Sequence, residues 1–392
     1  MALTPMQQRA LTNAAVTAGL TALIGLIVVQ LLPTERETAA PASPSSSPSP
    51  SVTCEPRWEH VDSPDPEDGG SLLLGVAAVG PDDAWAVGGA GDPVDPTATL
   101  TIEWNGDEWD VVPSPNPGSV ANRFEAVAAL SSDAAWAVGR ASDGTVDYPI
   151  AAQWDGGDWT LLPLPQELTD GALMGVSAIQ TDDVWAVGYQ GDVEAGTERA
   201  VALHWNGDEW RSAPVLPTLG GGRTALLAVA ATSRTDAWAV GYQRNQPVIL
   251  HFDGRAWALS LSEVPGDALG VTALGPQDAW VVGERVQRWD GTAWAETGAV
   301  RSKGTLRAIS AIGPEDVWAV GDRPTEASIL KPLVQRWDGR GWEVLRGSGV
   351  AGSISLTAVS AVPDGTVLAV GYRDGPRGRA TFAIRGTTCP GA

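Results

Sequence analysis

Tryptophan is confined to three positions of one repeated unit, and this confinement restricts the possible folds more than any other feature of the chain. The first position lies two residues before a Val-Gly pair, the second opens an Asn-Gly or Asp-Gly turn, and the third closes that turn five residues later. Because large aromatic side chains are costly to expose, their placement indicates one module used seven times. All 18 tryptophans occupy these positions: Trp85, Trp136, Trp185, Trp238, Trp280 and Trp318 the first; Trp104, Trp154, Trp205, Trp289 and Trp337 the second, with Phe252 once; Trp58, Trp109, Trp159, Trp210, Trp257, Trp294 and Trp342 the third.

Each unit has the pattern of four short antiparallel strands. In the first unit, apolar runs at 73–79 and 100–104 flank a Trp-Ala-Val-Gly segment, and a further strand follows Asn105-Gly106. Asn-Gly and Asp-Gly between apolar runs are strong hairpin signals because both residues tolerate positive φ. The first-position residues, ending with Leu368, recur every 38 to 53 residues, a period typical of β-propeller blades. The sequence therefore predicts an all-β, seven-bladed β-propeller of four-stranded antiparallel blades over residues 54–392.

A small residue recurs at one place in the first strand of every unit. Seven innermost strands crowd around one axis, so small side chains suit that place, whereas the tryptophans should lie farther out, where the blades diverge. These residues are Gly75, Ala126, Gly175, Ala228, Gly270, Ala308 and Ala358.

The seventh unit lacks its fourth strand, and a matching segment stands at the start of the domain. The unit has apolar runs at 356–362, 367–371 and 381–384, after which the chain ends. The segment Trp58–Pro64 resembles Trp109–Pro115 of the first unit. We therefore expect the N-terminal strand to complete the last blade and to close the ring, which leaves few free sheet edges.

Cys54 and Cys389 align with the hairpin between the third and fourth strands of the last blade. This register predicts a disulfide across the chain break in an exported protein, and two free thiols are the alternative. A bond that closes so long a loop would strongly restrict the unfolded chain.

The first 53 residues divide into three segments that indicate membrane attachment. Residues 1–10 are polar, residues 11–32 are apolar, and residues 33–53 are rich in Pro and Ser. As a helix, the apolar segment reaches about 33 Å, enough to cross a hydrocarbon core of roughly 30 Å. A cleavable signal peptide is the alternative, although Pro41 disfavours cleavage at the preceding alanine pair. We expect a single-pass signal anchor in the cell membrane, with a cytoplasmic N-terminus, a transmembrane helix over 11–32 and an extended linker to an extracytoplasmic propeller.

The chain is acidic and has no recognisable catalytic motif. It contains 47 acidic and 25 basic residues, for a formal charge of −22. Without a basic run, nucleic acid and anionic lipid surfaces are poor partners. Metalloprotease, phosphate-loop and nucleophile-elbow motifs are missing. We expect no cofactor, no metal and no catalytic residue.

Two further polar positions recur beside the tryptophans. His204 and His251 precede the second aromatic position, where other units have Glu, Gln or Arg, so we expect an exposed strand face there.

Aspartate recurs two residues before the first tryptophan. A ring of carboxylates could hold Ca²⁺, but aspartate in a tight turn commonly bonds nearby backbone amides, which we expect here. The recurrent aspartates are Asp83, Asp183, Asp236, Asp278 and Asp316.

The connections between second and third strands vary most and are candidates for ligand binding. They are long at 90–98, 141–148, 190–199 and 323–330, and one is a tight turn. Variable loops on a fixed scaffold commonly carry binding sites. The residue after each Val-Gly pair starts these loops, and in six units it is Tyr, Arg, Glu or Asp. Such a mixture of aromatic and charged side chains suits sugars or polar peptides. The alternative is that the tyrosines only cap strand ends. The candidate ligand-binding residues are Arg140, Tyr189, Tyr242, Glu284, Asp322 and Tyr372.

The segment from Val87-Gly88-Gly89 through Trp104-Asn-Gly-x-x-Trp109 to Pro113 resembles the kelch motif. The resemblance covers about residues 54–389 and implies the propeller of galactose-oxidase-like proteins. The double glycine is complete only in the first unit, and the two aromatics stand closer together than in typical kelch repeats. The Asp-Gly-x-x-Trp segments are also similar to repeats of sialidase-like and photosystem-assembly propellers. Copper oxidases of the kelch group need tyrosine and histidine ligands and a tyrosine-linked cysteine, a set that this chain does not match.

These observations favour a membrane-anchored binding module over an enzyme. We expect a cell-surface glycan or an extracellular protein to bind at the variable-loop face. Two alternatives remain open: an extracytoplasmic enzyme acting on glycosides or polysaccharides through acids such as Glu284 and Asp322, and an assembly or scaffold factor for membrane complexes.

Overall fold

The structure is a computed structural model, and it describes residues 57–66, 70–92, 94–213, 216–217, 222–244, 246–262, 268–299, 304–345, 349–376 and 378–387. These residues belong to one compact unit, Cys54–Ala392. They contain strands and turns but no helix, so none of them forms a helix suited to crossing a membrane. The predicted transmembrane helix over 11–32, the linker over 33–53 and the predicted Cys54–Cys389 disulfide lie outside the described residues.

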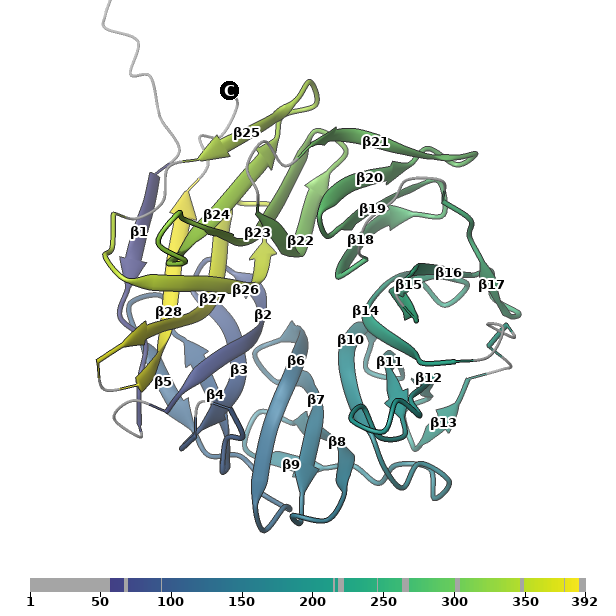
Figure 1. The fold of residues 1–392 in the computed structure, drawn as a ribbon. Helices are drawn as coiled ribbons and strands as arrows, with labels where there is room; N and C mark the ends of the chain where they lie inside the picture. Colours follow the sequence, from purple (N-terminus) through teal and green to yellow (C-terminus); the bar gives the residue numbers. More distant parts are fainter. Residues whose placement is uncertain are drawn as a thin grey trace, which may run out of the picture. The chain divides into compact units, whose positions relative to one another are not determined.

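The strands form seven four-stranded antiparallel sheets arranged around a common axis, as predicted (Figure 1). Blade 1 contains β2 (Leu72–Gly80), β3 (Asp83–Ala90), β4 (Ala98–Trp104) and β5 (Trp109–Val112); blade 2 contains β6 (Ala121–Ser131), β7 (Ala134–Ser142), β8 (Asp147–Trp154) and β9 (Trp159–Leu161). Blade 3 contains β10 (Ala172–Gln180), β11 (Asp183–Gln190), β12 (Arg199–Trp205) and β13 (Trp210–Ser212); blade 4 contains β14 (Thr224–Ser233), β15 (Asp236–Gln243), β16 (Gln246–Phe252) and β17 (Trp257–Leu259). Blade 5 contains β18 (Gly270–Gly275), β19 (Asp278–Val282), β20 (Arg285–Trp289) and β21 (Trp294–Ala299); blade 6 contains β22 (Thr305–Gly313), β23 (Asp316–Pro324), β24 (Leu330–Trp337) and β25 (Trp342–Leu345); blade 7 contains β26 (Ser353–Ala361), β27 (Thr366–Gly375), β28 (Gly378–Thr387) and β1 (Arg57–Val61).

The first strand of the propeller completes the last blade. Strand β1 pairs antiparallel with β28, and Trp58 stands opposite Gly386 in that register. Figure 1 shows β1 (purple) beside β28 (yellow). The predicted closure by the N-terminal strand is therefore confirmed.

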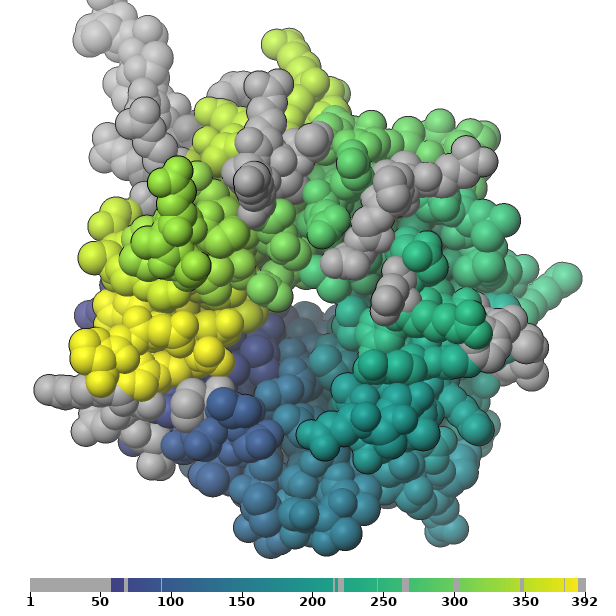
Figure 2. All heavy atoms as spheres, viewed as in Figure 1, coloured from purple at the N-terminus to yellow at the C-terminus, as the bar shows by residue number. Residues whose placement is uncertain are grey.

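The small residues of the first strands lie where neighbouring blades approach most closely. A Cβ atom on Gly75 would stand 2.9 Å from the Cα of Ala126, and one on Gly175 would stand 3.0 Å from the Cα of Ala228. A larger side chain would push the inner strands apart. Figure 2 shows the blades packed closely around a narrow central opening.

The first-position tryptophans join each blade to the next. Trp85 of blade 1 is fully buried, and its ring centre lies 4.9 Å from that of Trp154 and 5.2 Å from that of Trp159 in blade 2. Such edge-to-face and tilted contacts add to the stabilisation from burial. At the interface of blade 7 with blade 1, Leu368 takes the place of tryptophan and packs with Trp104 and Trp109.

The recurrent aspartates of blades 3 to 6 bond to side chains of the third strand. In blade 4, His251 Nε2 lies 2.7 Å from Asp236 Oδ1, and its ring stacks on Trp238 with the centres 4.1 Å apart. The antiparallel register pairs Trp238 with His251, which brings the nearby aspartate within reach. The arrangement is neither a Ca²⁺ ring nor the expected bonding to backbone amides, and the histidines are half-buried rather than exposed. The pairs are Asp183–His204, Asp236–His251, Asp278–Arg288 and Asp316–Arg336.

Blade 1 has two acids in the corresponding positions, Asp83 and Glu103. Burial raises the pKa of Asp83, and the nearby Asp133 raises it further. The pKa of Glu103 is raised by burial, then by Asp83 and Asp110. Because their pKa values are higher in the folded than in the unfolded protein, ionised Asp83 and Glu103 lower the stability of the fold at pH values above their folded-state pKa. This loss of stability disappears when the pH falls below their pKa in the unfolded protein.

We predict that Glu103→Gln raises the thermal midpoint of unfolding near neutral pH, because it removes one charge of this pair. The difference from the unmodified protein should shrink as the pH falls towards about 4, where both carboxyls become protonated. Thermal unfolding of the full-length protein across this range measures it, with the exposed Glu343→Gln as the control. A difference that does not change with pH would contradict the assigned pKa shifts.

Candidate functional site

The connections between second and third strands lie on the same face as the connections between blades; we call this the loop face. The backbone N–H of Asn122, at the start of blade 2, donates to the carbonyl of Pro96 in the β3–β4 connection over 2.7 Å. Gly171 donates likewise to Asp147 over 2.8 Å, and Thr224 donates to Glu198 over 2.9 Å. Each long loop is thus tied to the segment that leads into the next blade.

The six predicted ligand-binding residues occupy equivalent places in six blades. Five lie near the ends of second strands, where the register opposes Tyr189 to Ala172 and Tyr242 to Ala225. The loops therefore begin later than the sequence suggested. Glu284 alone lies outside a strand, exposed in the turn between β19 and β20.

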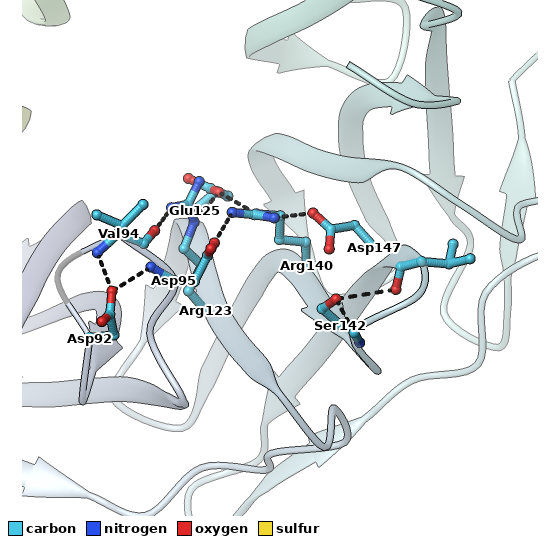
Figure 3. Close-up of polar contacts among 10 residues, drawn as sticks. Asp92, Val94, Asp95, Arg123, Glu125, Arg140, Ser142 and Asp147 are labelled. Atoms are coloured by element: carbon cyan, nitrogen blue, oxygen red, sulfur yellow. Dashed lines mark hydrogen bonds and ion pairs between the residues drawn. The ribbon is translucent and has the colours of Figure 1, made fainter. Parts of the chain in front are cut away.

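Arg140 is held by three carboxylates that come from three separate segments (Figure 3). Its guanidinium bonds to Asp147, lies 3.1 Å from Asp95 Oδ1 through Nη2, and lies 3.9 Å from Glu125 Oε1 through Nε. Glu125 also accepts a 2.6 Å hydrogen bond from Arg123 Nε. Burial alone lowers the pKa of Arg140, but the three carboxylates outweigh burial and raise it above its usual value. Arg140 therefore stays charged and fixed in position.

Two tyrosines continue the polar surface from Arg140 across blades 3 and 4. Burial raises the pKa of Tyr189, and the charge of Arg140 partly offsets this rise. Tyr242 also interacts electrostatically with the Tyr189 phenol. Tyr242 Oη donates to Glu198 Oε1 over 3.3 Å, and burial followed by that carboxylate raises its pKa. Both phenols therefore remain protonated donors at neutral pH.

Glu198 anchors the far end of this surface. The residue is fully buried, and Arg223 donates to it through Nε and Nη2, with distances of 2.9 and 2.5 Å to Oε1. Burial opposes its ionisation, but these hydrogen bonds outweigh burial and lower its pKa. Hydrogen bonds join Tyr242, Glu198 and Arg223, and electrostatic interactions link Arg140, Tyr189 and Tyr242. We call these five polar side chains of blades 2 to 4 the polar arc.

The other three predicted residues do not join the polar arc. Asp322 accepts hydrogen bonds from Arg307 Nε at 2.7 Å and from Ser355 Oγ at 2.6 Å, which ties blade 6 to blade 7. The ring of Tyr372 lies under the Arg379 guanidinium, 3.8 Å from its centre. The structure thus brings together three of the six residues and leaves the others on separate blades.

The acids that fix the polar arc were not identified from the sequence. Glu125 follows Phe124 at a register shift in β6, where the extra residue leaves the regular alternation of the strand. The one sign of Glu125 in the sequence was a charged residue inside an otherwise mostly apolar strand. Asp95, Asp147 and Glu198 lie in or beside variable loops, which have no repeat pattern to mark them. Among the described residues, no group of three or more His, Cys, Asp or Glu side chains is arranged to hold a metal.

The sheets and their closure define the chain as a seven-bladed β-propeller. Two solved structures share this fold: YCF48 from Cyanidioschyzon merolae, at 15% identity over 84% of this chain and 98% of that chain, with a TM-score of 0.57; and YCF48 bound to D1 peptide, at 14% identity over 85% and 97%, with a TM-score of 0.55. At this identity the likeness establishes the fold alone. Neither a protein-family model nor a curated protein sequence matches the chain. The kelch resemblance is not confirmed by these structures.

We predict that Arg140→Met destabilises the propeller by about 1–3 kcal/mol at neutral pH, because three carboxylates lose their shared counter-charge. The loss should become smaller at acidic pH, where protonation removes their mutual repulsion. Denaturant unfolding of the full-length protein at both pH values measures the effect. Arg211→Met, which removes the exposed pair with Glu209, should change stability by less than about 0.5 kcal/mol. Equal losses in the two variants would show that the carboxylates do not depend on Arg140.

Proposed function

We propose that this chain is a non-catalytic binding module that holds a polypeptide on the loop face of blades 2 to 4. The observation that carries this proposal is the polar arc, in which shared carboxylates hold Arg140, Tyr242 donates to the buried Glu198, and Tyr189 interacts electrostatically with both Arg140 and Tyr242. Tyrosine and arginine dominate the energetics of many protein interfaces. Side chains that are already held in place lose little conformational entropy when a ligand binds.

A polypeptide ligand is favoured over a glycan by the comparison with solved structures. One propeller of this fold is described as YCF48 bound to D1 peptide, so a related architecture accommodates a peptide. The donors and acceptors of the arc suit backbone amides and carbonyls equally well. Glycan binding, expected alongside protein binding from the sequence, is the second outcome of the test below.

The charges of the loop face argue for binding rather than catalysis. The proposed catalytic acids Glu284 and Asp322 belong to different blades, and Asp322 is engaged by Arg307 and Ser355. The raised carboxyl pKa values belong to Asp83 and Glu103, which begin and end strands away from the loop connections. A scaffold role for membrane complexes remains consistent with polypeptide binding.

We further propose that the propeller acts outside the cell membrane. This proposal is supported by the sequence: an apolar segment over residues 11–32 and a Pro/Ser-rich segment that follows it. A polypeptide on the membrane surface or in the surrounding wall would then be within reach of the loop face.

Tyr189→Ala and Tyr242→Ala test the site. Binding of the full-length protein to arrayed extracellular-domain peptides should weaken by about tenfold or more in each variant, because each change removes a hydroxyl donor and its aromatic surface. Tyr372→Ala changes the equivalent residue of blade 7 and should have little effect. If the protein binds arrayed glycans but no peptide, the ligand of this site is a glycan and not a polypeptide. Unchanged peptide binding by folded Tyr189→Ala and Tyr242→Ala variants would show that the polar arc is not part of the binding site.

A further inference from the structure

The interface between blade 7 and blade 1 lacks the tryptophan that every other interface contains. In the other six, a first-position tryptophan packs between neighbouring blades. Here Leu368 packs against Trp104 and Trp109. Leucine fills less volume than an indole ring, and Leu368 is itself buried among apolar side chains of both blades.

A groove opens at this same interface, between β1 and the β4–β5 hairpin. Its volume is about 480 Å³, within the range of roughly 300–1,000 Å³ typical of ligand sites. It is lined by Glu59, His60, Val61, Asp62, Trp104, Gly106, Asp107, Glu108 and Arg385. One wall therefore comes from the strand that closes the ring, and the other from the turn of the first blade.

Arg385 lies over Trp104 without a carboxylate partner among the described residues. Its guanidinium carbon is 5.7 Å from the centre of the Trp104 ring, and its Nε is buried without a hydrogen-bond partner. In blades 5 and 6 the equivalent arginines bond to aspartate, but blade 7 has Thr366 at the aspartate position. A planar guanidinium on the wall of an open groove can stack with a further aromatic ring.

The rim of the groove is negatively charged. Glu59, Asp62, Asp107 and Glu108 outnumber Arg385, and all four acids are exposed or at the surface. Hydrogen-bond donors and positive charges on a ligand would therefore be favoured at the rim, while an aromatic group would be favoured at the floor.

We propose that this groove is a second binding site, which accepts an aromatic side chain from a basic segment of a partner polypeptide. The aromatic ring would stand beside Arg385 and Trp104, at the one interface without its own tryptophan. Lysine or arginine residues flanking it would face the rim carboxylates. Residues 1–56 and 388–392 contain no Phe, Trp or Tyr, so these segments cannot supply the ring, and we assign the occupant to a partner polypeptide. The site is separate from the polar arc and does not depend on the function proposed for it.

The test uses the full-length protein and two tripeptide amides, Lys-Trp-Lys and Lys-Ala-Lys. Titration calorimetry, supported by NMR saturation transfer to the indole protons, should show Lys-Trp-Lys binding about tenfold or more tightly. Arg385→Met removes the guanidinium on which the indole would stack and should weaken Lys-Trp-Lys binding by about tenfold or more. Tyr189→Ala in the polar arc should leave it unchanged, so failure of one site does not imply failure of the other.

The chain offers a matched control for the rim. The hairpins 104–109 and 205–210 have the same sequence, Trp-Asn-Gly-Asp-Glu-Trp, but only the first borders the groove. Asp107→Lys should weaken Lys-Trp-Lys binding several-fold, whereas Asp208→Lys should not. Both side chains are exposed, so both variants should fold even if Arg385→Met does not. Equal binding of the two tripeptides, or equal effects of the two lysine substitutions, would overturn the proposal.

Discussion

The contact between a tryptophan of one blade and the aromatic pair of the next is the interaction on which this structure depends. A four-stranded sheet cannot bury both of its faces alone. Six of the seven blades leave one large indole to be covered by the next blade, while blade 7 presents Leu368 instead. Trp85 is fully buried only because blade 2 supplies Trp154 and Trp159. The contacts therefore run around the whole ring. Each of blades 1 to 6 packs a tryptophan against the next blade, blade 7 packs Leu368 against blade 1, and the ring must close for all of these side chains to be buried.

This rigid ring determines how the loop face can present polar groups. The second strands end at equivalent places, so Arg140, Tyr189 and Tyr242 occupy the same position on successive blades although they are about 50 residues apart in the chain. The variable loops then add the carboxylates that fix them. A repeated scaffold thus sets the spacing of the polar arc, and non-repeated segments set its charge.

The sequence predicted the features that are repeated and missed those that are not. Seven blades, the place of the small inner residues and the closing strand all follow from packing constraints that recur in every unit, and the structure confirms them. The bond of Asp236 with His251 depends on strand register rather than on spacing, so it was misread as turn chemistry. Glu198 and Arg223 come from a loop and an inter-blade connection, and no periodic pattern marks either residue. The six candidate residues occupy equivalent places on six blades, but five of them lie within second strands rather than at the starts of loops. Their role in ligand binding stays a prediction.

The pairing of β1 with β28 has a consequence for how the protein is made and loaded. The last blade needs strands from both ends of the domain, so six blades can form during synthesis while the seventh waits for the final residues of the chain. A chain stopped short of β28 would leave β1 without its neighbour and the ring open. Because the segment that precedes β1 leads to the proposed membrane anchor, a pull on the domain would act first on the β1–β28 pairing. The strength of the β1–β28 pairing therefore sets how much mechanical force the assembled ring can withstand.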